Sequence, residues 1–165
     1  MTLPQIYLRP AVTSDLDAIL ALERATDLAP HWPPAAYADI LAEPVSALPD
    51  NFTTQRCLFI AEKNGSLVGF AVSLLHPAAS NRVAELESVV VSASARRAGI
   101  GRALCRAVLD WSRSHGATEV ILEVRVNSAA AVALYTTLGF TQVVRRLRYY
   151  HGPNDDALLM RLVLQ

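Results

Sequence analysis

The sequence predicts an α/β (α+β) domain around a mixed sheet, on the evidence of its length, its apolar content and its periodicity. Its 165 residues amount to about one domain. Hydrophobic residues make up 52% of the chain, which favours a packed core over disorder. Strand-like apolar runs and segments of helical spacing follow the order β-α-α-β-β-β-α-β-α-β-β. No repeat or linker is visible, so we expect residues 1–165 to form a single domain with about seven strands and four helices.

The first third of the chain should hold one strand and two helices. The expected elements are a strand from Ile6 to Arg9, a helix from about Ser14 to Thr26, a helix from Ala35 to Glu43 and a loop from Val45 to Thr54. Ser14 suits the N-cap of the first helix, with Asp17 three residues later as its capping partner. Pro34 can open the second helix, because a proline in the first turn removes no intrahelical hydrogen bond.

The rest of the chain reads as six strands and two helices. The expected strands are Cys57 to Glu62, Leu67 to Leu75, Val83 to Ser92, Glu119 to Val126, Thr141 to Tyr150 and Ala157 to Leu164, and the helices run from about Gly99 to His115 and from Ser128 to Leu138. Asn64-Gly65 suits the positive φ angles of a two-residue hairpin turn. Gly116 and Gly139 are placed to end the two helices, because glycine adopts the left-handed conformation readily.

Composition narrows the possible partners. Fifteen basic residues balance fifteen acidic ones, so charge gives no reason to expect nucleic acid or an anionic membrane. Cys57 and Cys105 have neither disulfide nor metal spacing, and no metal site is expected. No apolar run approaches the roughly 20 residues of a membrane span. Met1 to Arg9 lacks the pattern of a signal peptide, so we expect a cytoplasmic protein.

The most informative segment runs from Arg96 to Arg102, between a strand and an amphipathic helix. Free backbone amides and the helix dipole make such a place an anion site. Gly99 and Gly101 carry no side chain that would block a phosphate. Neither the Walker lysine nor the third glycine of the dinucleotide motif is present, since Leu104 stands where that glycine would be. A tight turn without a ligand would use glycines in the same way.

Two motifs resemble the GNAT acetyltransferase superfamily: Arg-x-x-Gly-x-Gly over residues 96–101, and Asn127 to Tyr135 followed by Leu138-Gly139-Phe140. The resemblance implies the GNAT fold, a splayed cleft between two strands, and acetyl-coenzyme A as the donor. It places the coenzyme on the strand residues Val89, Val90 and Val91, on the loop residues Arg96, Arg97, Ala98, Gly99, Ile100, Gly101 and Arg102, and on Asn127 and Ser128. Ser128 stands where RimI-type chains usually have asparagine.

A narrower resemblance links the chain to RimI-type enzymes, which acetylate the N-terminal amine of a ribosomal protein. It lies in Leu122 to Arg125 and in Arg148-Tyr149-Tyr150. It implies that Glu123 is the general base and Tyr135 the general acid. The chemistry needs such a pair, because an α-amine with a pKa near ~8 must lose a proton and the leaving thiolate must gain one.

Several alternatives remain open. Glu85 competes for the role of base, because histone-type members of the superfamily carry theirs on the strand before the phosphate loop. The acceptor could be a small amine or a lysine side chain instead of a protein N-terminus. The chain could also be a non-catalytic module that senses acyl-coenzyme A. We expect a monomer or a homodimer.

Overall fold

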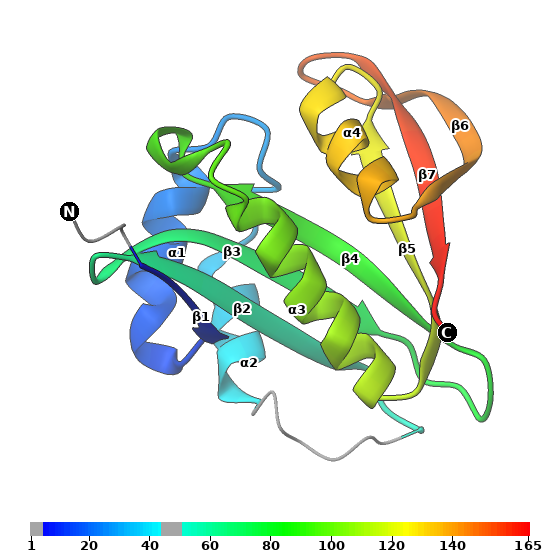
Figure 1. Ribbon diagram of the computed structural model, residues 1–165, viewed down its shortest axis with the longest axis horizontal. Helices are drawn as coiled ribbons and strands as arrows, with labels where there is room; N and C mark the ends of the chain where they lie inside the picture. The colour runs from blue at the N-terminus through cyan, green and yellow to red at the C-terminus, as the bar shows by residue number, and fades with distance from the viewer. Residues whose placement is uncertain (1–4, 44–50) are drawn as a thin grey trace.

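The computed structural model describes residues 5–43 and 51–165. One seven-stranded sheet has the order β1-β2-β3-β4-β5-β7-β6, and every neighbouring pair is antiparallel except β4–β5 (Figure 1). The strands are β1 (Ile6–Pro10), β2 (Gln55–Lys63), β3 (Ser66–Leu75), β4 (Arg82–Val91), β5 (Ala117–Arg125), β6 (Thr141–Tyr150) and β7 (Asp155–Val163). The α-helices are α1 (Leu16–Arg24), α2 (Pro34–Ala42), α3 (Ile100–Ser114) and α4 (Ala129–Thr137).

The structure confirms the predicted fold class and the order of helices and strands. Boundaries differ by a few residues at most, as at α1, which ends at Arg24 and not at Thr26. Part of the loop expected from Val45 to Thr54 lies outside the described residues, and residues 51–54 form neither helix nor strand. Residues 1–4 of the N-terminal segment also lie outside them.

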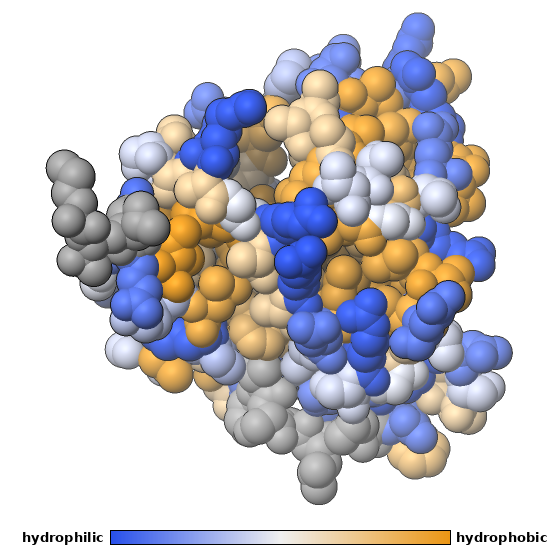
Figure 2. All heavy atoms as spheres, in the orientation of Figure 1, coloured by the Kyte–Doolittle hydropathy of each residue, from blue (hydrophilic) through white to orange (hydrophobic). Residues whose placement is uncertain are grey.

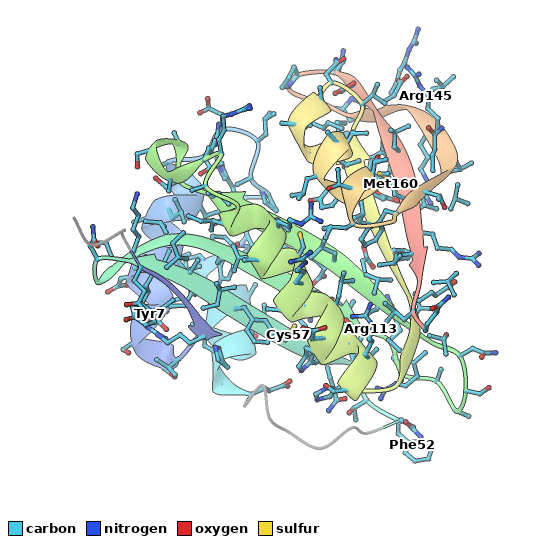
Figure 3. The ribbon with its side chains drawn as sticks, viewed as in Figure 1. Tyr7, Phe52, Cys57, Arg113, Arg145 and Met160 are labelled. Carbon is cyan, nitrogen blue, oxygen red and sulfur yellow. The ribbon has the colours of Figure 1, made fainter. Side chains whose placement is uncertain are left out.

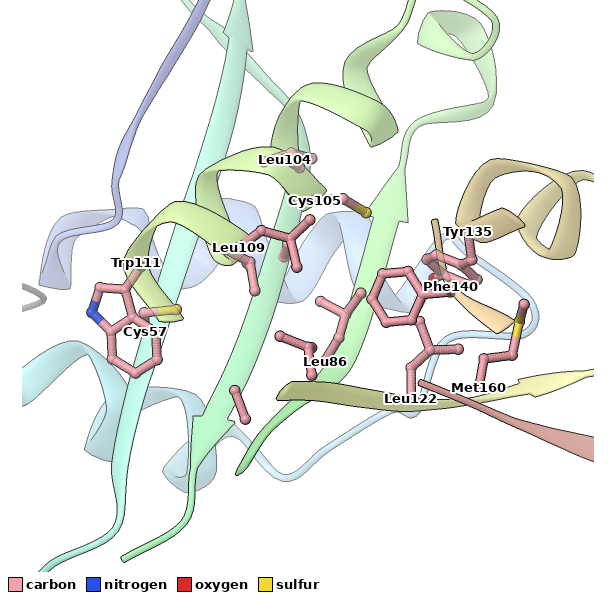
Figure 4. Close-up of a cluster of buried hydrophobic side chains, with 14 of the residues drawn as sticks. Cys57, Leu86, Leu104, Cys105, Leu109, Trp111, Leu122, Tyr135, Phe140 and Met160 are labelled. Carbon is pink, nitrogen blue, oxygen red and sulfur yellow. The ribbon is translucent and has the colours of Figure 1, made fainter. Parts of the chain in front are cut away.

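The helices cover both faces of the sheet, and each face has its own core. On one face α3 packs on β2, β3, β4 and β5, and residues of α4 join the same cluster. That cluster includes Leu86, Cys105, Leu122, Tyr135 and Phe140, which Figure 4 shows side by side. On the other face α1 and α2 pack on β2, β3 and β4 in a second cluster. Trp111 and Cys105 are core residues of the first face.

The exposed side of α3 is charged, as its spacing predicts. Figure 2 shows hydrophilic residues along this helix, with apolar surface around it. Arg113 on α3 and Arg145 on the edge strand β6, both labelled in Figure 3, are exposed. Within the described residues, no helix is long and apolar enough to cross a membrane.

A β-bulge in β4 changes which side chains face which core. Val72 of β3 pairs with Ser88, but the next residue, Ser73, pairs with Leu86, so Glu87 has no partner of its own. Such an extra residue shifts the alternation of side chains by one position. Leu86 therefore belongs to the α3 face, whereas Val90 belongs to the core beneath α1 and α2.

The expected N-cap at Ser14 is wrong. A 3₁₀ turn, Thr13–Asp15, precedes α1, and the Asp15 carboxylate accepts a hydrogen bond from the Val12 amide at 2.8 Å. The same carboxylate receives both terminal nitrogens of Arg9, at 2.8 and 2.9 Å. Asp15 thus accepts hydrogen bonds both from the backbone at the start of the 3₁₀ turn and from the Arg9 cation. The neutral Ser14 hydroxyl could not pair with a cation in this way.

We expect Asp15→Asn to lower the free energy of unfolding at pH 7 by about 1–2 kcal/mol, the usual value of a charged hydrogen bond. The hydrogen bond from Arg9 holds the pKa of Asp15 below its ordinary value. The contribution of Asp15 to stability is therefore fully present above the ordinary pKa of an aspartate, near ~4. It is lost as the pH falls below that value and through the lowered pKa of the folded protein. Urea unfolding of both proteins at pH 7 and pH 3 measures this.

The matched control is Asp110→Asn, which removes an exposed i,i+3 pair with Arg113. Such surface pairs contribute less than about 1 kcal/mol, so this variant should change little. An Asp15→Asn protein as stable as the wild type at pH 7 would contradict the role given to Asp15.

Candidate active site

The two parallel strands at the centre of the sheet separate part-way along their length. β4 and β5 pair at only four positions, the last of which joins Glu85 to Ile121. β4 continues to Val91 and β5 to Arg125, and each keeps its other neighbour, β3 or β7, to that end. The facing edges beyond Glu85 and Ile121 therefore hold unpaired backbone groups. The predicted splay is confirmed (Figure 1).

A cleft of about 1040 Å³ occupies the splay and extends to both sides of it. Of the residues singled out in the sequence, it is lined by Val89, Val90, Arg96, Glu123, Asn127, Ser128 and Tyr135. Val91, Arg97, Ala98, Gly99, Ile100, Gly101 and Arg102 do not line it. Arg97, Ala98 and Gly99 of this second group belong to the loop before α3, and Ile100, Gly101 and Arg102 begin that helix. The Ile100 side chain is buried in the core. Only the backbone of Ile100 could therefore contact a ligand.

The loop over residues 96–102 exposes a run of backbone amides. Arg97 has a φ of 61° and Gly99 a φ of 76°, so the chain turns sharply twice before α3 begins. The first hydrogen bond into the helix joins the Ala103 amide to the Gly99 carbonyl at 3.0 Å. The amides of the first α3 residues lack an intrahelical acceptor, as at every helix start.

Cations and open space surround these amides. Arg96 and Arg97 are exposed, and Arg102 is partly exposed with its guanidinium 3.3 Å from the Thr137 hydroxyl. A Cβ built on Gly99 would meet no atom within 4 Å, and one on Gly101 would lie in ordinary contact with Leu134 and Val91. Amides at a helix start, with guanidinium groups around open space, suit the diphosphate of a coenzyme A molecule.

Ser128 holds the expected position at the start of α4, but its side chain makes no capping hydrogen bond. The neighbouring Asn127 amide donates to the Asp155 carboxylate at 3.1 Å instead. The Ser128 hydroxyl therefore does not cap α4, although the helix begins directly after it. Ser128 lines the cleft, as does Asn127.

Glu123 and Tyr135 reach the cleft from opposite faces of the sheet. Leu122 and Val124 belong to the core on the α3 face, so Glu123 between them points to the α1 and α2 face. Tyr135 comes from α4 and packs edge-to-face on Phe140, with 5.9 Å between the ring centroids (Figure 4). The two side chains line one cleft because the sheet is open between β4 and β5.

The partners of Glu123 come from the edge strand β6. Arg146 Nη1 lies 2.9 Å from Glu123 Oε1, and Tyr149 hydrogen-bonds the same carboxylate. That hydrogen bond raises the pKa of the Tyr149 phenol. Glu123 is thus held as one member of a partly exposed polar cluster.

Burial gives Tyr135 different properties. The Tyr135 side chain is about nine-tenths buried, and this burial raises the pKa of its phenol. The phenol therefore keeps its proton throughout the neutral range, as a proton donor must. Cys105, in the same core, is a thiol whose pKa burial raises to about 12, so it is no nucleophile.

Two other carboxylates line the same cleft. Glu85 lies at the closed end of the splay, where its carboxylate is 3.4 Å from His76 Nε2. Glu87 receives two hydrogen bonds from Arg56, at 2.9 and 3.3 Å. Glu123 lies two residues beyond the last paired position, in the open part of the cleft, whereas Glu85 is itself the paired residue.

Several residues that line the cleft have no role that the sequence predicts. Tyr149 and Tyr150 form one side of the cleft, and the Arg125 guanidinium lies 4.2 Å from the ring centroid of Tyr150. Residues 26–32, between α1 and α2, form the opposite side. Two adjacent tyrosines near the chain end were a visible signal, but nothing in the sequence places residues 26–32 beside them.

A comparison with known protein families identifies the family of this chain. The profile of the Acetyltransferase (GNAT) family matches residues 18–140. The chain belongs to the GNAT acetyltransferase family. It is therefore an acetyl-coenzyme A-dependent enzyme that acetylates an amine, and acetyl-coenzyme A is its donor.

Relatives and solved structures agree with the family. This GNAT enzyme is 32% identical to an N-alpha-acetyltransferase of Sulfurisphaera tokodaii over 93% of its own length and 90% of that relative. It is 37% identical to the N-alpha-acetyltransferase RimI of Mycobacterium tuberculosis over 79% of its length and 74% of the relative. The ribosomal-protein-S18-alanine N-acetyltransferase of Escherichia coli superposes with a TM-score of 0.75 at 27% identity, over 98% of this chain and 95% of that one.

The donor, acetyl-coenzyme A, is a thioester. A thioester is already activated, so the protein must supply proton transfer and orientation. In the part of the chain that the structure describes, no group of three or more His, Cys, Asp or Glu side chains is placed to hold a metal ion.

We expect Gly99→Ala to weaken acetyl-coenzyme A binding at least tenfold, about 1.4 kcal/mol. An L side chain disfavours the φ of 76° at Gly99, so the amides before α3 would lose their alignment. Isothermal titration calorimetry with acetyl-coenzyme A measures the dissociation constant.

Gly65→Ala is the matched control, because Gly65 also has a φ of 76° and open space around it, but lies in the β2–β3 turn. Both variants should lose similar thermal stability, and only Gly99→Ala should lose affinity. Equal affinities of Gly99→Ala and Gly65→Ala for acetyl-coenzyme A would show that the loop before α3 does not bind the coenzyme.

Proposed function

We propose that this enzyme acetylates the N-terminal α-amine of a protein, such as a ribosomal protein. The observation that carries the proposal is the shape of the cleft on the α1 and α2 face. Residues 26–32 and residues 149–152 both line this cleft, and Glu123 lines it with them. An open trough of this kind admits an extended chain end, and the similarity to N-alpha-acetyltransferases supports the same acceptor class.

The opening in the sheet lets donor and acceptor approach from opposite faces. The coenzyme would lie along the free edge of β4 at Val89, Val90 and Val91, with its diphosphate at residues 96–102. Its thioester would then lie in the splay. The acceptor amine would enter from the α1 and α2 face, towards which Glu123 points.

Two side chains would handle the protons. Glu123 would take a proton from the ammonium of the acceptor, directly or through water, so that the nitrogen lone pair can attack the thioester carbonyl carbon. As the new C–N bond forms and the C–S bond breaks, Tyr135 would give its proton to the departing sulfur and regain one from the acylated nitrogen, directly or through water. Transfer would be direct, because the buried Cys105 thiol stays protonated.

Carboxylates line the acceptor side of the cleft, although Arg56 pairs with Glu87 and Arg146 with Glu123. Glu85, Glu87 and Glu123 line the α1 and α2 side of the cleft, and an N-terminal amine arrives mostly as an ammonium ion. A lysine or a small amine would carry the same charge, so charge alone does not choose among these acceptors. A sensor of acyl-coenzyme A would need neither Glu123 nor Tyr135.

The direct test is to incubate the enzyme with acetyl-coenzyme A, with peptides that vary in their first residues, and with a panel of small amines. We expect acetyl mass to appear on the α-amine of peptides and not on internal lysines. Acetylation of small amines or lysines alone would overturn the proposed acceptor. Coenzyme binding without any transfer would favour a sensor.

Glu123→Gln should lower the rate by roughly 10²–10⁴, the usual range for a general base, with little change in donor affinity. The loss should shrink at high pH, where more of the amine arrives deprotonated. Glu85→Gln, its matched control on β4, should stay within a few-fold of the wild type. The measurement is the pH–rate profile of each variant with one peptide.

The opposite result, a near-normal rate for Glu123→Gln and a collapse for Glu85→Gln, would move the base to β4. Near-normal rates in both variants would mean that neither glutamate is the base and that the site only orients an amine that solvent has deprotonated. Proximity alone can lower the activation free energy by several kcal/mol.

Tyr135 should cause no alkaline decline. Burial raises the pKa of its phenol above the ordinary value near ~10, so its acid form persists to higher pH. We therefore expect the wild-type rate to rise to a plateau and hold it between about pH 8 and pH 9.5. Tyr135→Phe should be slower throughout, by a smaller factor than Glu123→Gln if water replaces the phenol. A wild-type decline beginning near pH 8, absent from Tyr135→Phe, would exclude this role.

A further inference from the structure

A buried carboxylate lies behind one wall of the cleft. Glu23, in the last turn of α1, has only 1% of its surface exposed. Its Oε1 atom accepts a hydrogen bond from the Trp32 amide at 3.0 Å and another from the Tyr37 hydroxyl at 2.7 Å. A carboxylate this deep is costly unless it is hydrogen-bonded, so these donors and Glu23 fix one another.

The backbone before Trp32 needs such support. His31 has a φ of 54°, a left-handed conformation that is unfavourable for a residue other than glycine. Its ring nitrogen Nε2 lies 3.1 Å from the Thr26 carbonyl oxygen, which closes residues 26–31 into a compact loop. The next amide, on Trp32, is the one that Glu23 binds, so this hydrogen bond helps to offset the cost at His31.

The Trp32 side chain links the position of this loop to the shape of two cavities, because it lines both. Its ring lies 5.4 Å from the Tyr37 ring, which in turn meets Phe70 of β3 edge-on at 5.9 Å. Trp32 lines the main cleft and also a neighbouring cavity of about 500 Å³, and Glu87 is the other residue common to both. A shift of Trp32 would therefore change the acceptor side of the cleft.

We propose that Glu23 is a positioning residue that sets the enzyme's affinity and selectivity for its acceptor. It acts by holding residues 26–32 in place as a wall of the cleft. The inference rests on the proposed entry of the acceptor on this face, and not on the acceptor being a peptide. Residues 96–102 lie outside α1 and α2 and the loop between them, and β4 would offer the coenzyme its free backbone edge, while the Val90 side chain packs beneath α1 and α2. We therefore expect acetyl-coenzyme A affinity not to respond to Glu23.

The test compares Glu23→Ala with Glu23→Gln, using the best acceptor of the wild type. Alanine removes both hydrogen bonds, so the KM for the acceptor should rise on the order of tenfold, while the KM for acetyl-coenzyme A stays within about twofold. Glutamine keeps an oxygen that can accept from both donors, so it should restore the acceptor KM to within about threefold of the wild type. With Glu23→Ala, kcat/KM should also vary less among acceptors that differ next to the amine.

Ser112→Ala is the control for a loss of stability alone. Ser112 is fully buried in α3 and donates to the Val108 carbonyl at 2.8 Å, away from the wall. It should lower thermal stability and leave both KM values and the acceptor preference unchanged. Equal rises in both KM values for Glu23→Ala, or an unchanged acceptor KM, would overturn the inference.

Tyr37→Phe keeps the test decisive if Glu23→Ala does not fold. It removes one donor and keeps the ring, so the acceptor KM should rise by about threefold with the acetyl-coenzyme A KM unchanged. No change in the acceptor KM of this variant would also overturn the inference. If the wild type acetylates no peptide, the proposed function fails, and the same comparison with the amine that it does acetylate still tests Glu23.

Discussion

The separation of β4 from β5 beyond Glu85 and Ile121 is the constraint on which the rest of the structure depends. An open edge inside a sheet forfeits backbone hydrogen bonds, which folded proteins seldom leave unmade. Here β4 and β5 tolerate the lost hydrogen bonds because each strand stays paired on its other side, β4 with β3 and β5 with β7. The opening leaves a free backbone edge on β4 and lets Glu123 and Tyr135 line one cleft.

The opening also divides the molecule into two parts that must stay in register. Only four paired positions join β4 to β5, so side-chain packing must also hold the two parts of the sheet together. The core on the α3 face supplies it, since Leu86 of β4 and Cys105 of α3 lie in one cluster with Leu122, Tyr135 and Phe140 (Figure 4). Tyr135 is thus a core residue whose hydroxyl end reaches the site. Its burial, its raised pKa and its place at the cleft have one cause.

Sequence patterns predict the elements well because helical and strand periodicity, turn glycines and the loop at residues 96–102 are local. Three features of the site are not local. The bulge at Glu87 depends on pairing with β3, and it decides which β4 side chains face the acceptor. The contacts of Glu123 with Arg146 and Tyr149 join strands that are neighbours only through β7. Glu23 looks like one more polar residue of an amphipathic helix until Trp32 and Tyr37 are seen to close over it.

The edge strand β6 carries a break with a consequence beyond the site. Its register with β7 slips between Arg146 and Tyr150, where Arg148 has a φ of 52° and its amide donates to Asp156 at 2.8 Å. A regular outer strand is a template on which another chain can add its own strand, and bulges and charges prevent this. The distortion that brings Tyr149 and Tyr150 to the cleft therefore also protects the enzyme against edge-to-edge aggregation at high concentration.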